Sequence, residues 1–471
     1  MNGDFTPRRG SRVRRSLPLI TTASSLSMIY VAATNSPVFT DFMRAIGARE
    51  MHFGLIGGIP LVMLSAQFIG ALVANHVHRR KPLFVILALA GRILYLPIAF
   101  LPLIFPGARA EAMVMALIGL MGLNSALSNM TGPPWLAWMA DLVPHGVLNR
   151  YWGLRQRAMH LTWTFSFVGI VLFTCLTGWP AMRIFPILAV VGTLAAITDV
   201  LLFVGVHEPP NRILPHQPVL DMLLAPLRNP GYRPFIVFSC AWSFTGMFSA
   251  AFMQLYVLKV LRLPMWQTTL IWCFLGIGVA LSSRRWGRLA DRHGHRPILL
   301  FCMFVKPLIL VAFLIITPRT AFCILSVAFL VDSMWNSAVM VSSNGYMLKM
   351  APVENRSMYI AAITGLAGIC GGLGALVGGW FLEHFAGFSA PFMGWTWNNY
   401  QLLFVVNIFM RLACLPLVLR IREPTSSSAG TVVKALWGIR AMRLVLFPIG
   451  VYWLWNRRPS EHAGVGPDDV V

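Results

Sequence analysis

Long apolar runs dominate the chain, and short polar segments separate them. A helix needs about 20 apolar residues to cross the hydrocarbon core of a bilayer, which is about 30 Å thick. The runs approach or exceed this length, and charged residues gather between them rather than within them. The pattern predicts twelve transmembrane helices, at about residues 18–40, 53–75, 83–103, 112–133, 161–177, 180–204, 235–258, 267–283, 298–317, 321–341, 358–381 and 400–419.

The longest polar insert, residues 206–234, lies near the middle of the chain and is rich in proline. It separates six runs from six others, so we interpret it as a linker between two halves, 18–205 and 235–420. The halves share short motifs. Arg80-Lys81-Pro82 precedes the third run, and His295-Arg296-Pro297 precedes the ninth. The sequence therefore predicts an all-α integral membrane protein with twelve transmembrane helices in two pseudo-symmetric six-helix halves.

Composition supports a membrane location. The chain is 57% hydrophobic and 11% charged, whereas soluble proteins carry about 25% charged residues. In a soluble protein the net charge of +22 would indicate nucleic-acid binding. Here the basic residues fall between apolar runs, where they face anionic lipid headgroups. We therefore expect contact with membrane lipid and no nucleic-acid partner.

The distribution of basic residues predicts the orientation. About 28 Lys and Arg fall on the side that holds the N-terminus, and about 7 fall on the other side. Both termini and the linker are therefore expected in the cytoplasm, in a bacterial inner membrane. Residues 1–17 form a basic tail by this interpretation, and residues 421–471 form a second tail. In the second tail, residues 431–455 mix bases with apolar residues around Pro448, which favours a membrane-surface segment over a thirteenth span.

A basic stretch between the eighth and ninth runs, WGRLADRHGHRP at 286–297, carries the clearest motif. Its glycines suit a tight turn between two helices. The stretch resembles the signature loop of the major facilitator superfamily through Gly287, Asp291, Arg292, Gly294 and Arg296. The corresponding first-half loop has His76 at the Asp position and lacks the glycines, so the role of that Asp is not transferred to the first half.

The resemblance implies a transporter whose two halves rock about a site near the middle of the membrane. In that family the first, fourth, seventh and tenth spans line the cavity. The Asp of the signature loop contacts the start of the helix that faces it from the other half. For this chain the resemblance implies that Asp291 lies near the start of the fifth span, close to Arg150, Arg155 and Arg157.

Polar residues inside spans are costly, and they usually face a cavity or one another. The fourth span carries Asn124 and Ser128, and the tenth carries Asp332 and Asn336. Each pair is separated by four residues and shares a helical face. With Asn35 of the first span and Gln254 of the seventh they could form a polar ring, and we expect them to contact substrate or a coupling ion. The alternative is a set of hydrogen bonds between helices.

Three basic residues are predicted within outer spans: Arg92, Lys306 and Arg411. Structural ion pairing is the favoured interpretation, and an anion-attracting field in the cavity is the alternative. With a rise of about 1.5 Å per residue, Asp332, Lys306 and Arg411 reach a similar depth. Asp332 therefore either pairs with one of these bases or faces the cavity beside Asn336. The resemblance favours the cavity.

No hydrolase motif, phosphate-binding loop or metal-ligand cluster is found, and the seven cysteines contain no CxxC pair. We predict no enzyme activity, catalytic residue, cofactor or metal. The prediction is a monomeric secondary active transporter that works by alternating access, with or without proton coupling. Its substrate would be a small organic anion or a neutral solute such as a sugar. Drug efflux is less favoured because the fifth span lacks the antiporter motif, and a non-transporting receptor or scaffold on the same fold is the other alternative.

Overall fold

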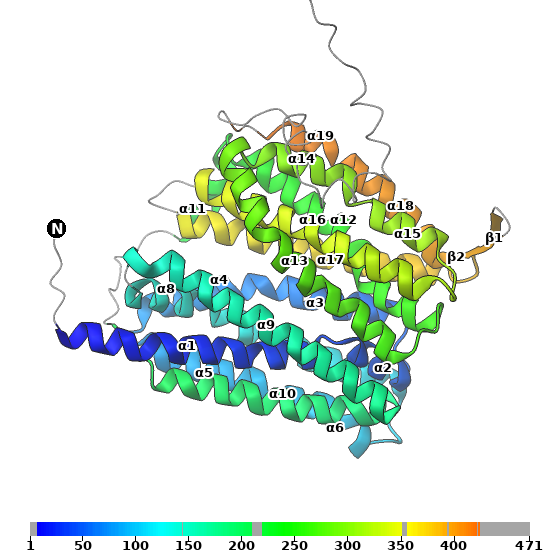
Figure 1. Cartoon of the computed structure of the whole chain (residues 1–471), viewed down its shortest axis with the longest axis horizontal. Helices are drawn as coiled ribbons and strands as arrows, with labels where there is room; N and C mark the ends of the chain where they lie inside the picture. Colours follow the sequence, from blue (N-terminus) through cyan, green and yellow to red (C-terminus); the bar gives the residue numbers. More distant parts are fainter. Residues whose placement is uncertain are drawn as a thin grey trace, which may run out of the picture.

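The computed structural model describes residues 7–143, 145–209, 219–350, 356–392, 395–421 and 423. Within these residues, 12 helical segments are long and apolar enough to cross a membrane. They run along a common long axis (Figure 1). The predicted all-α, twelve-span architecture is confirmed, and the chain is a multi-pass integral membrane protein.

The first half holds six spans, several of which are built from two or more helical segments. Its helices are α1 (Pro7–Thr34), α2 (Pro37–Ile46), α3 (Glu50–Val62), η1 (Met63–Ser65), α4 (Ala66–His76), α5 (Arg80–Ile93), α6 (Tyr95–Ile104), α7 (Ala110–Met130), α8 (Gly132–Leu142), α9 (His145–Thr177) and α10 (Ala181–Val204).

The described part of the linker contains the helix α11 (Val219–Arg228), which packs against the second half. The second half also holds six spans, and a short antiparallel hairpin precedes the last of them. Its elements are α12 (Arg233–Lys259), α13 (Met265–His293), α14 (Arg296–Val305), α15 (Leu308–Ile315), α16 (Ala321–Met350), α17 (Arg356–His384), β1 (Ser389–Phe392), β2 (Trp395–Asn398), α18 (Asn399–Ala413) and α19 (Leu415–Leu419).

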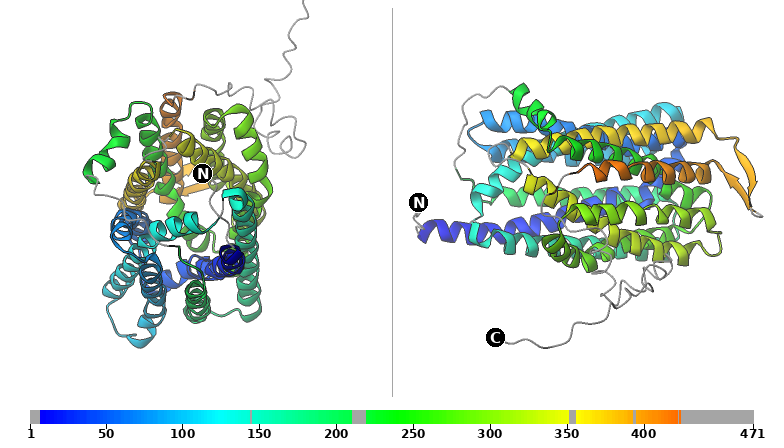
Figure 2. Two further views of the ribbon diagram at one scale, coloured as in Figure 1. Left: turned by 90° about the vertical axis from the view of Figure 1, so that its left-hand side faces the viewer. Right: turned by 90° about the horizontal axis from the view of Figure 1, so that it is seen from above.

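The two halves lie side by side, the first below and the second above in Figure 1. They meet along two seams, α3 against α17 and α9 against α13. We call the end of the bundle where α1 begins the basic end, and the opposite end the hairpin end. The second view of Figure 2 shows the start of α1 at one end and the β1–β2 hairpin at the other.

Prolines explain the breaks in four of the broken spans. Proline lacks a backbone N–H, and its ring clashes with the carbonyl of the residue four positions earlier. Pro37 starts α2, Pro97 follows the break between α5 and α6, Pro307 separates α14 from α15, and Pro416 follows the break before α19. Each break leaves helix ends inside the membrane, where unpaired backbone groups need partners.

The seam of α3 and α17 depends on glycine. A Cβ atom on Gly58 would lie 2.7 Å from the carbonyl oxygen of Gly372, and one on Gly54 would lie 2.7 Å from that of Ala375. No side chain fits at these distances, so backbone packs directly on backbone. The contact lies between the two halves and is therefore one surface along which they can move.

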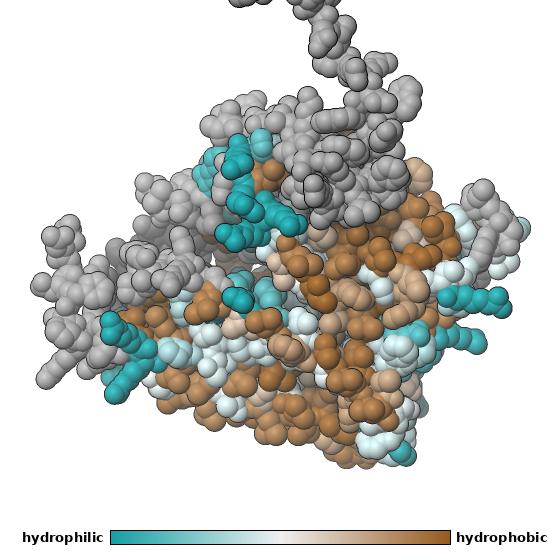
Figure 3. Space-filling model, in the orientation of Figure 1, coloured by the Kyte–Doolittle hydropathy of each residue, from teal (hydrophilic) through white to brown (hydrophobic). Residues whose placement is uncertain are grey.

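The outer surface suits lipid. Large apolar side chains are exposed along the spans, including Phe165, Leu176 and Ile86. On the face shown in Figure 3 they form a broad apolar surface between hydrophilic groups at its left- and right-hand ends. This distribution is typical of a protein with a bilayer around its middle and water at both ends.

Several predicted boundaries were wrong in one direction, because the helices continue past the apolar runs. Residues 7–17 of the predicted basic tail are helical and form the start of α1. The segment between the predicted fourth and fifth spans is helical from His145, and α13 continues to His293. Hydropathy marks the edge of the bilayer, but Arg, Gln and Leu are good helix formers that extend the helix into water. Apart from residues 421 and 423, the predicted tail 421–471 lies outside the described residues.

The signature stretch is therefore a shorter turn than predicted. Gly287, Asp291 and Arg292 are helical, and the turn is made at Gly294, whose φ is 87°. At this φ a side chain would be strained, so glycine is required there. Arg296 begins α14. The backbone of Asp291 is described, whereas its side chain lies outside the described atoms.

A carboxylate caps the third span of each half. Glu208, just after α10, accepts hydrogen bonds from the backbone N–H groups of Arg80 and Lys81 at the start of α5. Glu423, just after α19, accepts 2.8 Å bonds from the N–H groups of His295 and Arg296 at the start of α14. A carboxylate at a helix N-terminus satisfies orphan donors and complements the helix dipole.

Glu423 has a further partner, the Lys349 ammonium at 3.1 Å. Burial alone would raise the pKa of Glu423, but the backbone donors and Lys349 outweigh it and lower the pKa below its ordinary value. The cap is therefore ionised at neutral pH.

Candidate functional site

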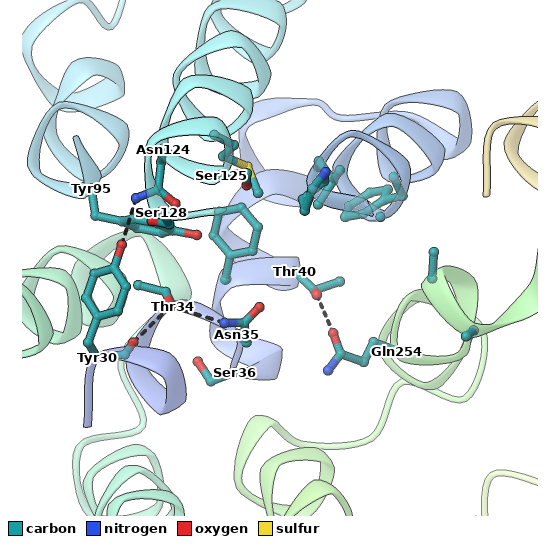
Figure 4. A pocket seen from close by; sticks show the side chains of 18 of the residues that line it. Tyr30, Thr34, Asn35, Ser36, Thr40, Tyr95, Asn124, Ser125, Ser128 and Gln254 are labelled. Carbon is teal, nitrogen blue, oxygen red and sulfur yellow. Dashed lines mark hydrogen bonds between the residues drawn. The ribbon is translucent and has the colours of Figure 1, made fainter. Parts of the chain in front are cut away.

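A cavity of about 480 Å³ lies between the halves, within the range of small-molecule sites. Figure 4 shows side chains from both halves facing it. The described residues that line it are Tyr30, Thr34, Asn35, Ser36, Phe39, Thr40, Phe53, Ile56, Gly57, Pro60, Arg92, Tyr95, Met121, Asn124, Ser125, Ser128, Asn129, Met247, Ala250, Ala251, Gln254 and Trp272.

The two halves contribute different chemistry to the lining. Nearly all of the polar side chains come from the first half, whereas the second half contributes Met247, Ala250, Ala251, Trp272 and one polar residue, Gln254. The cavity thus has a polar wall and a largely apolar wall. A solute that is polar at one end and apolar at the other fits such a pair of surfaces.

Asn124 organises the polar wall. Its Nδ2 donates to the hydroxyl of Tyr30 at 3.0 Å and to the carbonyl of Gly91 at 2.7 Å. Tyr30 in turn packs edge-on against Tyr95, with ring centroids 5.3 Å apart. One amide therefore links α1, α5 and α7 beside the cavity, and a buried network satisfied in this way is rigid.

Arg92 is the one charged residue among the described residues that line the cavity. It lies in the last turn of α5, next to the break before α6, where helix carbonyls favour a cation. Its guanidinium carbon lies 4.4 Å from the centroid of the Tyr30 ring, a cation–π contact. Its Nη2 lies 3.8 Å from Oδ2 of Asp199 on α10, which is too far for a hydrogen bond.

The hairpin end of the cavity is closed by contacts between the halves. Thr40 donates to Oε1 of Gln254 at 2.7 Å. Beyond it, Glu50 on α3 pairs with Lys259 on α12 and accepts a bond from Tyr400 on α18. The backbone N–H of Met51 donates to Glu383 on α17 at 3.1 Å. Among pairs in which both residues are described, these are all the hydrogen bonds that join the halves, and each joins them at the cavity or at the hairpin end.

A second polar cluster lies inside the second half. Lys306, at the end of α14, donates to Oδ1 of Asp332 at 2.7 Å. Arg411, in the last turn of α18, donates to Oδ1 of Asn407 at 2.9 Å and to the carbonyl of Gly246 at 3.5 Å. Its guanidinium carbon lies 5.2 Å from the centroid of the Trp242 ring. Both bases thus have partners inside the second half, and neither lines the cavity.

The structure brings some of the predicted site residues together and separates others. Asn35, Asn124, Ser128 and Gln254 line the cavity. The tenth span, expected on the cavity, contributes no described residue to it. Asp332 is paired with Lys306 instead, which is the structural alternative. Asn336 is exposed but does not line this cavity.

The three buried bases have different surroundings. Lys306 forms an ion pair with Asp332, whereas the described hydrogen-bond partners of Arg411 are neutral, Asn407 and the carbonyl of Gly246. Arg92 faces Asp199 at 3.8 Å and also lines the cavity. It therefore has features of both alternatives, structural pairing and an anion-attracting charge in the cavity. The sequence reasoning missed Tyr30, Tyr95 and Asp199. An acid inside the predicted span 180–204 was the available signal for Asp199.

The side chains of the signature stretch and its predicted partners are described only in part. Arg155 is described, and its guanidinium donates to Ser24 at 2.8 Å and lies over the ring of Trp135. The Arg150 side chain lies outside the described atoms, and Arg157 is exposed. Among the described residues, no group of three or more His, Cys, Asp or Glu could hold a metal ion.

Comparison with known proteins gives one family and several solved structures of similar fold. The model of the Major Facilitator Superfamily matches residues 20–319 and 276–456. No curated protein sequence matches the chain. A mutant of the nucleoside transporter NupG superposes with a TM-score of 0.67 at 12% identity, over 86% of this chain and 100% of that chain.

Two other solved structures are similar in the same way. A bacterial homologue of the human lysosomal transporter Spinster, inward-facing and unoccupied, gives a TM-score of 0.55 at 13% identity, over 89% of this chain and 95% of that chain. A POT family transporter in complex with a thioalcohol-conjugated peptide gives 0.61 at 10% identity, over 87% and 97%. At these identities the similarity concerns the fold alone.

Proposed function

Because the chain belongs to the major facilitator superfamily, a family of secondary transporters, we propose that it carries a small polar solute across the membrane by alternating access. The observation that supports this most directly is the cavity between the halves, which is polar on one wall and closed at the hairpin end. The halves would rock about this cavity along the glycine seam of α3 and α17.

We propose that the basic end is cytoplasmic. The excess of Lys and Arg at that end, about 28 against about 7, follows the positive-inside rule. Both termini and the linker would then lie in the cytoplasm of a bacterial cell, with the protein in its inner membrane. The contacts that close the hairpin end correspond to a state that opens inward.

The signature stretch would act as a conformational switch. α13, which carries Asp291, packs against α9, so a carboxylate at its end can favour one state through the α9 N-terminus and its arginines. Exposed contacts of this kind contribute about 0.3–1 kcal/mol each. This is sufficient to bias two states of similar free energy.

Substrate class and coupling belong to the same proposal. A small organic anion and a neutral solute such as a sugar both suit the polar wall, and proton coupling is compatible with either. The protein would act as a monomer surrounded by lipid, without a catalytic role.

Cysteine accessibility tests the proposal without knowledge of the substrate. In a variant without native cysteines, Ser128→Cys should be labelled by an impermeant maleimide from the cytoplasmic side. With Glu50→Gln added, which removes the charge that holds Lys259, labelling from the outside should increase. A residue in the linker at 219–228 should be labelled from the cytoplasm in both backgrounds.

Labelling of Ser128→Cys from one side only, whatever the state of Glu50, would contradict alternating access and favour a receptor or scaffold. Labelling of the linker from the outside would overturn the orientation. Cys at Ile86, which lies on α5 and is exposed to lipid, serves as the control because its reactivity should not change with Glu50→Gln.

A further inference from the structure

Arg92 is the one charged group among the described residues that line the cavity, and its carboxylate partner Asp199 lies 3.8 Å away. We propose that the cavity binds a small organic anion whose carboxylate contacts the guanidinium of Arg92. When no substrate is bound, Asp199 is the electrostatic partner of this guanidinium. The inference rests on the proposed function, because it names the substrate class of the same cavity. Arg92 would be the residue that determines specificity for charge.

The geometry leaves Arg92 available to a ligand. A guanidinium offers five N–H donors in a planar fork that matches a carboxylate. Asp199 approaches it only to 3.8 Å, beyond hydrogen-bond distance. The Arg92 side chain is 20% exposed and lines the cavity. A ligand carboxylate can therefore form the short bidentate bonds that Asp199 does not form.

The local charge also favours an anion. Arg155 on α9 acts electrostatically on Asp199 together with Arg92, so two basic groups lie near a single described acid. Arg155 is held by Ser24 and Trp135, outside the lining. An anion in the cavity neutralises the excess charge, whereas a cation would add to it. No carboxylate is found among the described lining residues to receive a cation.

Asp199 has the features of an internal competitor for the ligand, because its carboxylate faces the same guanidinium. It is 5% exposed, and its partner in the structure is the distant Arg92. A substrate carboxylate that takes Arg92 would leave Asp199 with Arg155, so the aspartate keeps a positive group nearby. Tyr30, the titratable group on α1 beside Arg92, stays bonded to Asn124. The exchange therefore needs no change in the rest of the wall.

The opposite wall indicates the shape of the anion. Met247, Ala250, Ala251 and Trp272 present apolar surface, which a small inorganic anion would leave uncovered. An alkyl or aryl carboxylate places its charge on Arg92 and its body on this surface. Burial of the body contributes about 25 cal/mol per Å², so affinity should rise with the size of the apolar group.

The first test measures binding to the purified full chain. Melting temperatures are recorded with acetate, hexanoate, benzoate and 1-naphthoate, and with the primary amide of each acid. We expect the larger acids to raise the melting temperature and their amides to have no effect. If no acid stabilises the protein, or if the amides stabilise it equally, the inference is wrong. If nucleosides or sugars stabilise it instead, the inference fails while the proposed transport of a small solute stands.

The second test uses variants, with the affinity for the best acid as the readout. Asp199→Asn should bind the acid about fivefold more tightly, because an internal competitor worth about 1 kcal/mol is removed. Arg92→Gln should lose binding. Since this variant strands Asp199, the neutral double variant Arg92→Gln/Asp199→Asn keeps the fold testable, and it should also lose binding. Unchanged or weaker binding in Asp199→Asn, or retained binding in the double variant, would overturn the proposal.

Discussion

Replacement of Asp332 by asparagine should destabilise the second half without altering the cavity, because Asp332 does not line it. The Lys306 ammonium lies 2.7 Å from the Asp332 carboxylate, and the two side chains are 9% and 16% exposed. At an effective dielectric constant of about 20, the attraction at this distance is about 6 kcal/mol. Desolvation of the two ions offsets most of it, so the pair contributes little net stability.

The loss in Asp332→Asn comes from the stranded base. Removing one partner of a fully buried pair costs about 3–5 kcal/mol. Because Asp332 is partly exposed and water screens it, we expect about 2–3 kcal/mol here. Replacing both members, as in Lys306→Leu/Asp332→Leu, removes the stranded charge and should restore stability to within about 1 kcal/mol of the wild type.

Thermal unfolding in detergent measures this effect, with a thiol-reactive dye that reports exposure of the buried Cys273, Cys302 and Cys414. Asp332→Asn should melt several degrees below the wild type. The control is Asp41→Asn, which breaks a pair of the same 2.7 Å length with an exposed partner, Arg44, and should cost less than about 1 kcal/mol. An unchanged melting temperature in Asp332→Asn, with coupled transport lost, would refute the structural role.

Three further outcomes are expected. The cap made by Glu423 is fully stabilising above its unfolded pKa of about 4.3 and is lost as the pH falls through its lower folded pKa. The melting temperature should therefore fall in that acidic range. The Glu423→Gln variant should melt below the wild type at neutral pH, and its melting temperature should fall less on acidification. Gly58→Ala should slow transport, since its Cβ would meet the α17 backbone at 2.7 Å, whereas Gly119→Ala has nothing within 4 Å and should behave as the wild type. Asp291→Asn should slow transport with an unchanged melting temperature, and a wild-type rate would argue against the switch.

The fold was predictable because it depends on the hydropathy pattern along the sequence. Span count follows from apolar length, and the two-half plan follows from the linker and the repeated motifs. The ends of the helices were not predictable in the same way. α9 begins at His145 and α13 ends at His293, beyond the apolar runs, where helix continuation depends on local propensity and packing rather than on hydropathy.

The site was predictable in part. Asn124 and Gln254 were found because a polar residue in a span is costly wherever it faces. The partners could not be deduced, since pairing depends on the rotation of each helix about its axis. Lys306 lies at the break before Pro307 and pairs with Asp332 of the tenth span. The tenth span therefore faces its own half with this acid instead of the cavity.

The carboxylate caps have a mechanical consequence. Glu208 and Glu423 each tie the chain just after the last span of a half to the first turn of its third span. A half held together in this way moves as a rigid body, so a displacement at one of its ends is transmitted to the other end. The contact around Gly58, where backbone packs on backbone, is then a surface along which the two halves can slide. The first half lacks the signature glycines but has its carboxylate cap, so rigidity is the property that the two halves share.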